Sequence, residues 1–135
     1  MDLFAELSEK GFPMSIISCG SWDLCHPPLE KRKAASFFSK IISNYFTYDG
    51  NRISGMTYHV RKGEDKITHA NVLGYDPGKT IVIGDGYTDL PLLDWCSFPV
   101  LIDPDGKMKN RFPGKKYNYI KSVPELTKLL NDNRL

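Results

Sequence analysis

The chain has 135 residues, of which 41% are hydrophobic and 25% charged, and its formal net charge is +2 at pH 7. These values fit a soluble globular domain that is long enough to bury a core. The net charge is too small to argue for a nucleic-acid or membrane-surface partner, and no apolar run approaches the roughly 20 residues that span a bilayer.

Cysteine usage and the N-terminal residues indicate the cellular location of the protein. The three cysteines, Cys19, Cys25 and Cys96, are odd in number and lack metal-ligand spacing. The first residues have neither the basic start nor the long apolar core of a signal peptide. We therefore expect reduced thiols and a cytoplasmic location. Five basic residues over 107–116 are interpreted as a solvated face rather than a nucleic-acid surface.

The first half of the chain predicts a helix, a strand, more helix and a hairpin. Residues 42–60 predict the hairpin because Asp49-Gly50-Asn51 separates two alternating segments. The pattern before it predicts a helix over 2–10, a strand over 14–17, a helical turn over 22–26 broken by Pro27 and Pro28, and a longer helix over 29–41.

The second half alternates strands and helices. The predicted helices cover 64–73, 90–95 and the segment from 123 onward, and the predicted strands cover 80–83, 98–102 and 117–120. This alternation predicts an α/β fold in which helices cover a parallel sheet of about four strands. The hairpin at about 42–60 is expected to project from that sheet. We predict a single domain over residues 1–135.

The stretch Thr80–Leu93 is the most informative part of the sequence. Its apolar residues do not alternate before Gly84, which is typical of a strand buried on both faces. Asp85 is therefore expected at the carboxyl edge of the sheet, where open α/β folds bind ligands. Thr88 or Asp89 is expected to cap the next helix. Spacing alone leaves two interpretations equally open, a metal or phosphate site and a capped turn without chemistry.

Two other polar residues lie at the ends of predicted elements. Ser18 ends the predicted strand over 14–17, and Lys66 lies at the start of the helix over 64–73. Taken singly, Ser18 is more often a turn cap and Lys66 a solvated lysine. Taken together, a hydroxyl and an ammonium suit phosphoryl oxygens, and an aspartate at a sheet edge suits Mg²⁺.

The order of these residues resembles the haloacid-dehalogenase-like (HAD) superfamily, and within it the phosphoserine-phosphatase-like branch. The matching segments are Ile16-Ile17-Ser18, Gly63-Glu64-Asp65-Lys66, Gly84-Asp85-Gly86-Tyr87-Thr88-Asp89 and Ile102-Asp103-Pro104-Asp105, with Asn44, Gly50 and Gly55 between the first two. The resemblance covers about residues 2 to 130. It implies a three-layer α/β/α, Rossmann-like (HAD-like) fold.

The resemblance also implies a reaction and a role for each residue. An aspartate nucleophile would attack a phosphomonoester and form an aspartyl-phosphate that water then hydrolyses. Asp85, with Asp89, would hold Mg²⁺, and Asp89 could instead orient a water or pair with Lys66. Ser18 and the Gly20 amide would bind the phosphoryl group, and Lys66 would stabilise the phosphate and the intermediate.

The family's Asp-x-Asp nucleophile motif, its strand and the usual helical cap precede the Ser18 motif and are not in this sequence. Asp103-x-Asp105 is rejected as a substitute because its position matches the family's ordinary tail. We therefore expect a HAD-like phosphatase chain that is incomplete and not competent alone. The alternative is a non-catalytic HAD-like domain that binds a phosphorylated ligand or a protein partner.

The expected partners follow from the same reasoning. They are a small phosphorylated metabolite, and either a second copy of the chain or the missing segment supplied in trans, with no nucleic acid and no membrane. A sheet without its central strand exposes an apolar edge, which favours dimerisation. A receiver-like or nucleotide-binding module is disfavoured because its acidic cluster and its glycine-rich loops are absent.

Overall fold

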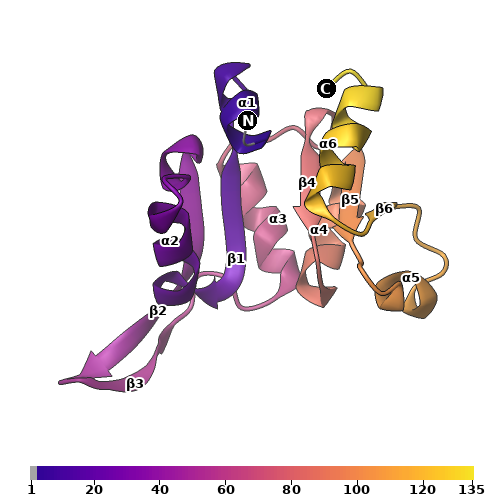
Figure 1. Cartoon of the computed structure of the whole chain (residues 1–135). Helices are drawn as coiled ribbons and strands as arrows, with labels where there is room; N and C mark the ends of the chain where they lie inside the picture. Colours follow the sequence, from indigo (N-terminus) through magenta and orange to yellow (C-terminus); the bar gives the residue numbers. More distant parts are fainter. Residues whose placement is uncertain (1–2) are drawn as a thin grey trace. The chain divides into compact units, whose positions relative to one another are not determined.

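The computed structural model describes residues 3–135, and the chain forms two compact units that divide between Asp65 and Lys66 (Figure 1). Each unit contains one three-stranded sheet. The predicted single sheet of about four parallel strands is therefore wrong for the described residues, although the mixed α/β class is confirmed. Whether the chain is a single domain stays a prediction.

The first unit is built on the sheet β1-β2-β3. Its elements are α1 (Leu3–Glu9), β1 (Ser15–Ser21), α2 (Trp22–Lys31), the 3-10 turn η1 (Ala35–Phe37), β2 (Lys40–Asp49) and β3 (Arg52–Thr57). β1 pairs with β2 in parallel, with Ile16 opposite Ile41. β2 pairs with β3 antiparallel, with Phe46 opposite Met56. β2 is therefore the central strand, and β1 lies at an edge of its sheet.

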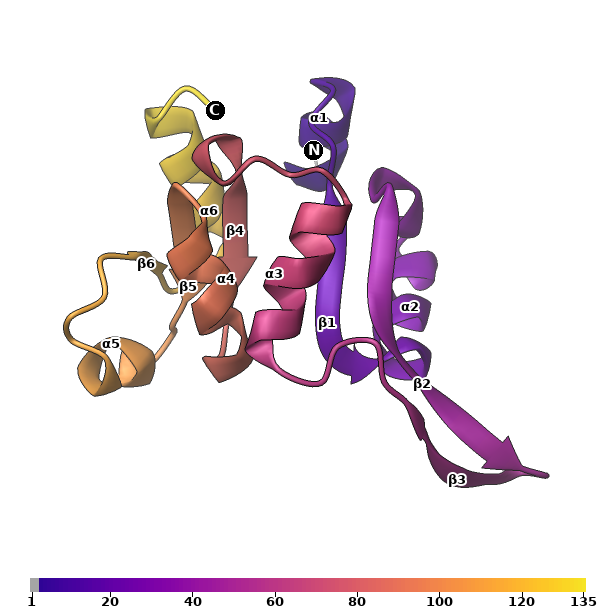
Figure 2. The ribbon, with the colours of Figure 1, turned by 180° about the vertical axis from the view of Figure 1, so that it is seen from behind.

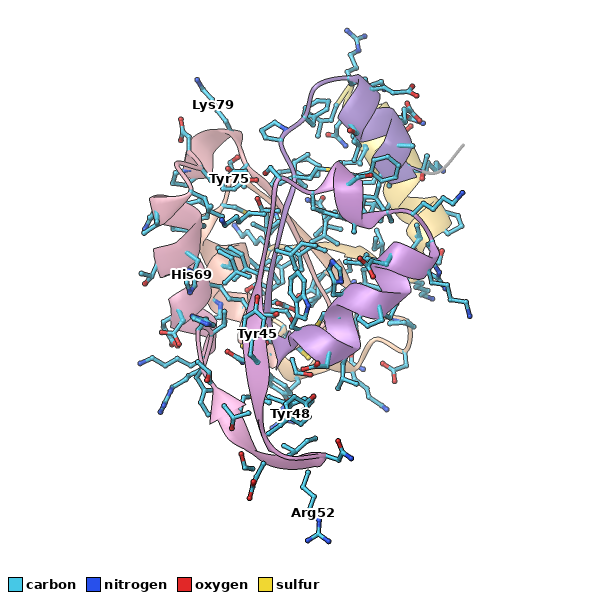
Figure 3. All side chains as sticks on the ribbon, turned by 90° about the vertical axis from the view of Figure 1, so that its left-hand side faces the viewer. Tyr45, Tyr48, Arg52, His69, Tyr75 and Lys79 are labelled. Atoms are coloured by element: carbon cyan, nitrogen blue, oxygen red, sulfur yellow. The ribbon has the colours of Figure 1, made fainter. Side chains whose placement is uncertain are left out.

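The predicted hairpin is confirmed. Asp49 and Arg52 form the last pair of the ladder, and Gly50 between them has a φ of +58°, a conformation that glycine adopts without strain. The hairpin extends well beyond α2 (Figure 1). Figure 3 shows Arg52 at its tip, with Tyr48 and Tyr45 further back along β2.

Between β1 and β2 two helix predictions are wrong. Pro27 and Pro28 do not break the helix that begins at Trp22, which continues as α2 to Lys31. The chain then turns at Lys33, whose φ is +54°, and no helix covers 29–41. Instead Ile41 pairs in the sheet, so strand pairing prevails over the helical spacing of the apolar residues.

The second unit is built on the parallel sheet β4-β5-β6. The elements of this half are α3 (Gly63–Val72, which begins just before the division), the 3-10 turn η2 (Pro77–Lys79), β4 (Ile81–Gly84), the 3-10 turn η3 (Tyr87–Asp89), α4 (Leu90–Trp95), β5 (Phe98–Ile102), α5 (Lys107–Arg111), β6 (Asn118–Ile120) and α6 (Val123–Asp132). All predicted strands and helices of this half are present, and α5 was not predicted.

Helices cover both faces of the second sheet. α6 lies on the face turned to the viewer in Figure 1, and α4 lies on the opposite face, which Figure 2 shows. Val82, Leu93 and Leu101 form the buried cluster between β4, α4 and β5. This packing holds the carboxyl ends of β4 and β5 next to each other, because the two strands pair up to Gly84 and Leu101. β4 lies at the edge of this sheet.

Within residues 3–135, no helix has both the length and the apolar character needed to cross a bilayer.

Candidate functional site at the carboxyl end of β4

The turn after β4 is closed by the side chain of Asp89. One carboxylate oxygen, Oδ2, accepts hydrogen bonds from the backbone N–H groups of Asp85 (2.8 Å) and Gly86 (3.1 Å). Asp89 therefore caps the short 3-10 turn η3 and makes no side-chain cap on α4, unlike the prediction. These bonds fix the backbone that carries Asp85.

Gly84 is required for this arrangement. A Cβ atom built on Gly84 would lie 2.5 Å from Cβ, 2.7 Å from Cγ and 2.8 Å from Oδ2 of Asp89. Such separations are well inside van der Waals contact, so any side chain at position 84 displaces Asp89. By contrast, a Cβ built on Gly86 meets nothing within 4 Å.

The second oxygen of Asp89 binds Lys66. Lys66 Nζ lies 2.5 Å from Asp89 Oδ1 and 3.3 Å from Thr88 Oγ1. The side chain of Lys66 is 5% exposed and that of Asp89 is 15% exposed, so this ion pair is largely shielded from water. A lysine ammonium has three N–H donors. Two are directed at Asp89 and Thr88, which leaves one for a further acceptor.

Asp85 is the acid of this turn whose carboxylate remains available. It is exposed, and no hydrogen bond or ion pair of its side chain occurs among residues 3–135. Mg²⁺ is often bound through one or two carboxylates, with water and a substrate phosphate completing the shell. The Asp85 carboxylate fits one such position, whereas both oxygens of Asp89 already have partners.

No group of three or more His, Cys, Asp or Glu residues that could hold a metal occurs in the described part of the chain. The predicted Mg²⁺ site of Asp85 and Asp89 therefore stays a prediction, with Asp85 the better placed ligand.

Ser18 and Gly20 lie together at the end of β1 in the first unit. Ser18 Oγ accepts a hydrogen bond from the Gly20 N–H (3.0 Å) and lies 3.6 Å from Cys25 Sγ. The bond from Gly20 uses a lone pair of the Ser18 oxygen, so the hydroxyl proton can be donated to Cys25 Sγ or to another acceptor. The Gly20 amide is already engaged by Ser18. The predicted phosphate-binding roles of Ser18 and Gly20 stay predictions.

Asn44 was identified only as part of the resemblance, and the structure gives it a local task. It is 1% exposed. Its Nδ2 donates to the carbonyls of Cys19 and Val60, and its Oδ1 accepts from the N–H groups of His59 and Val60. One side chain thus ties the residue after Ser18 to the segment that leads into α3. An asparagine midway along a predicted strand is the signal that sequence reasoning could have used, because a polar side chain buried there needs hydrogen-bond partners.

Asp103 is not a free carboxylate. It is 5% exposed, and its two oxygens accept from the backbone N–H groups of Met108 (3.1 Å) and Lys109 (2.9 Å). Asp103 therefore anchors α5 at the end of β5. Each Asp103 oxygen thus already has a backbone partner, which agrees with the interpretation of Asp103-x-Asp105 as the family's ordinary tail and not as the nucleophile motif.

Asp94 on α4 holds the segment that returns from α5. It accepts from Lys115 Nζ (2.5 Å) and from the Tyr117 hydroxyl (2.5 Å). Burial raises the pKa of Asp94, but these two hydrogen bonds and the charge of Lys115 outweigh it, so the pKa lies below the ordinary value. Burial, and then the hydrogen bond to Asp94, raise the pKa of Tyr117.

The sequence profile of the haloacid dehalogenase-like hydrolase family matches residues 26–103, which is more than half of the chain. The chain therefore belongs to the haloacid dehalogenase-like hydrolases. The matched range contains Lys66 and the whole turn from Gly84 to Asp89, while Ser18 lies ahead of it.

Phosphoserine phosphatase is a structural neighbour. The substrate-bound complex of that enzyme superposes with a TM-score of 0.69 at 16% identity, covering 93% of this chain and 60% of the phosphatase chain. The apo form gives 0.69 at 17% identity over 92% and 62% of the two chains. An analogue of the phospho-aspartyl intermediate gives 0.69 at 17% over 93% and 60%.

At these identities the likeness concerns the fold. The chain spans about 60% of the length of these phosphatases. No protein of curated function matches it.

Proposed function

We propose that this chain supplies the phosphate-binding and metal-binding part of a HAD-type phosphatase that hydrolyses a small phosphomonoester. The observation that carries the proposal is the turn after β4, in which Asp89 binds Lys66 and two backbone amides while the Asp85 side chain has no partner among residues 3–135. Family membership and the fold of phosphoserine phosphatase support the same reaction class.

In the proposed site each residue has a defined task. Asp89 holds the Lys66 ammonium in place, and the remaining N–H of Lys66 donates to a phosphoryl oxygen. For the Ser18 hydroxyl, the proposed role of donor to a phosphoryl oxygen rests on the family resemblance. Asp85 is the ligand that this chain offers to Mg²⁺, which when bound would offset negative charge on the phosphate.

The nucleophile is the part that these 135 residues do not offer. Their one Asp-x-Asp pattern is Asp103-x-Asp105, and Asp103 is buried and bonded to α5. We therefore propose that hydrolysis requires an aspartate from outside this sequence, either preceding it in the same polypeptide or supplied in trans. The same observation favours the second candidate, a HAD-like domain that binds a phosphorylated ligand without turnover.

Binding and turnover together separate these candidates. Isothermal titration of the 135-residue chain with ethyl phosphate is expected to show Mg²⁺-dependent binding. Asp85→Asn should remove that dependence, whereas Asp132→Asn, a change at an exposed site on α6, should keep it. Absence of Mg²⁺-dependent binding in the unmodified chain would contradict the proposal.

Turnover is then measured with an aryl phosphate. The chain alone is expected to be inactive, and a chain extended by the coding sequence found upstream of Met1 is expected to be active. Binding without turnover in both forms would rule out a nucleophile that precedes these residues in the same polypeptide, and would leave the non-catalytic domain and a nucleophile supplied in trans. Mg²⁺-dependent turnover by the 135 residues alone, lost in Asp85→Asn, would refute the external nucleophile.

The free sheet edges suggest what else the chain contacts. β1 and β4 are each an edge strand of their own sheet, and an unpaired edge is a template for another strand. We propose that a second copy, or the missing segment, pairs with one of them. Light scattering should therefore give a dimer for the isolated chain, and a monomer at all concentrations would count against pairing between copies.

A further inference from the structure

A pocket next to Asp85 is not used by the proposed phosphate and metal positions. Its volume is about 340 Å³, and it lies in the second unit, where the chain leaves β4 and β5. The side chains that matter for its chemistry are Asp85, Tyr87, Asp103, Asp105, Lys107 and Arg111. Asp85 thus lines both the proposed metal position and this pocket, so a ligand held here would adjoin the phosphate.

Most of the charges in the pocket are already compensated. Lys107 Nζ lies 2.9 Å from Asp105 Oδ2, and Asp103 is bonded to backbone amides of α5. Two charges differ, the Asp85 carboxylate described above and the Arg111 guanidinium, because no ion pair formed by residues 3–135 includes either of them. The pocket therefore contains one guanidinium whose charge lacks a carboxylate partner within the described residues.

Arg111 is also held in position. Its guanidinium lies 4.8 Å from the centre of the Tyr87 ring, and the Phe112 ring meets the Tyr87 ring edge-on at 5.5 Å. A guanidinium stacked on a ring keeps the N–H donors at its edge, where they can bind an oxyanion in a bidentate manner. The Arg111 side chain is exposed, and this contact restricts its motion before a ligand arrives, which lowers the entropy cost of binding.

We propose that Arg111 forms an oxyanion subsite beside the phosphate position, and that the natural substrate carries a second anionic group, a carboxylate or a phosphate, on its leaving group. This inference rests on the proposed function for the identity of the ligand as a substrate. The subsite itself requires only the pocket and Arg111.

The test uses the 135-residue chain and follows the Arg111 side-chain N–H and Tyr87 ring resonances by NMR. Malonate probes a carboxylate source, and methylenebisphosphonate probes a phosphate source. At least one is expected to shift both resonances. Arg111→Gln should weaken binding of that probe at least about tenfold, as loss of a charge-assisted hydrogen bond implies. Arg111→Lys should give an intermediate affinity, because it keeps the charge and loses the planar fork.

Lys116→Gln is the matched control, because Lys116 is an exposed cation of the same segment that does not line the pocket. Its affinity should equal that of the unmodified chain. If neither probe moves the Arg111 and Tyr87 resonances, or if Lys116→Gln weakens binding as much as Arg111→Gln, the subsite is refuted.

The ethyl phosphate titration keeps the two proposals separate. Ethyl phosphate has no second anionic group, so its Mg²⁺-dependent binding should be the same in Arg111→Gln and in the unmodified chain. Binding of ethyl phosphate without any response of Arg111 to malonate or the bisphosphonate would overturn the subsite alone. A response of Arg111 without Mg²⁺-dependent binding of ethyl phosphate would overturn the proposed function and leave an oxyanion site.

Discussion

Loss of the negative charge should affect the free energy of unfolding very differently at the two acids of the turn after β4. Asp89→Asn leaves the ammonium of Lys66, whose side chain is 5% exposed, without its counter-charge. Asp85→Asn removes a carboxylate that is exposed and has no side-chain partner among residues 3–135. The first change should strongly destabilise the fold, and the second should leave stability within about 0.5 kcal/mol of the unmodified chain.

The magnitude follows from the geometry of the ion pair. Unit charges 2.5 Å apart attract by about 7 kcal/mol at an effective dielectric constant of about 20, and desolvation of both groups offsets part of that. Removal of one partner from a buried pair costs about 3–5 kcal/mol, because the other charge stays buried. For a urea m value of about 2 kcal/mol/M, this lowers the midpoint of unfolding by about 2 M.

Urea denaturation followed by circular dichroism measures both effects, and a double-mutant cycle isolates the pair. Lys66→Met should cost about as much as Asp89→Asn, and the combined variant should cost clearly less than the two single costs together. If Asp89→Asn shifts the midpoint no further than Asp85→Asn does, the ion pair does not hold the turn, and our assignment of Asp89 is wrong.

Three further predictions concern other positions within the two units. Gly84→Ala should lower stability by about 1–3 kcal/mol through overpacking, while Gly86→Ala, where a Cβ meets nothing, should be tolerated; equal thermal midpoints would contradict this. Asn44→Ala should lower the free energy of unfolding in urea by about 3 kcal/mol, because it leaves buried backbone groups without hydrogen-bond partners. A loss under about 1 kcal/mol would show that water replaces the amide.

The pKa of Asp94 is lower in the folded chain, so its stabilisation is present above the ordinary value of 3.8 and is lost as pH falls through the folded value. The pKa of Tyr117 is raised, so the stabilisation from its neutral hydroxyl is fully present below the ordinary value of 10 and is lost as pH rises through the folded value. Unfolding free energies measured against pH should therefore converge for Asp94→Asn and the unmodified chain in acid, with a difference under about 1 kcal/mol at neutral pH.

The parts of the fold that sequence predicted are those fixed by local chemistry. Asp49-Gly50-Asn51 specifies a tight turn, and the chain forms the hairpin there. The apolar run before Gly84 and the change at Leu90 to helical spacing mark β4 and α4 within one or two residues. Each of these signals is contained in a few consecutive residues, so it does not depend on distant partners.

The parts that failed depend on contacts far along the chain. Phe38 and Ile41 have helical spacing, yet Phe38 packs against Phe4 (5.5 Å between ring centres) and Ile41 pairs with Ile16. A pattern of spacing cannot show which of the two arrangements buries more surface. The helix α5 was missed for a related reason, since its anchor is the Asp103 side chain and not its own apolar pattern.

The site itself illustrates the same division. Sequence places two aspartates, Asp85 and Asp89, in one turn, and the resemblance assigns both to metal, with the orientation of a water or pairing with Lys66 as alternatives for Asp89. The structure distinguishes them by their partners, because a carboxylate that already binds a lysine and two amides has no oxygen left that is free of partners. We therefore expect Asp89 to act on a ligand through Lys66 and through the backbone of Asp85. If so, Lys66→Met should weaken phosphate binding even when Mg²⁺ is saturating, whereas Asp85→Asn should weaken it only when Mg²⁺ is present. Titrations of ethyl phosphate at two Mg²⁺ concentrations can distinguish these outcomes. Identical Mg²⁺ dependence of binding in Lys66→Met and Asp85→Asn would show that Asp89, through Lys66, and Asp85 do not have these separate roles.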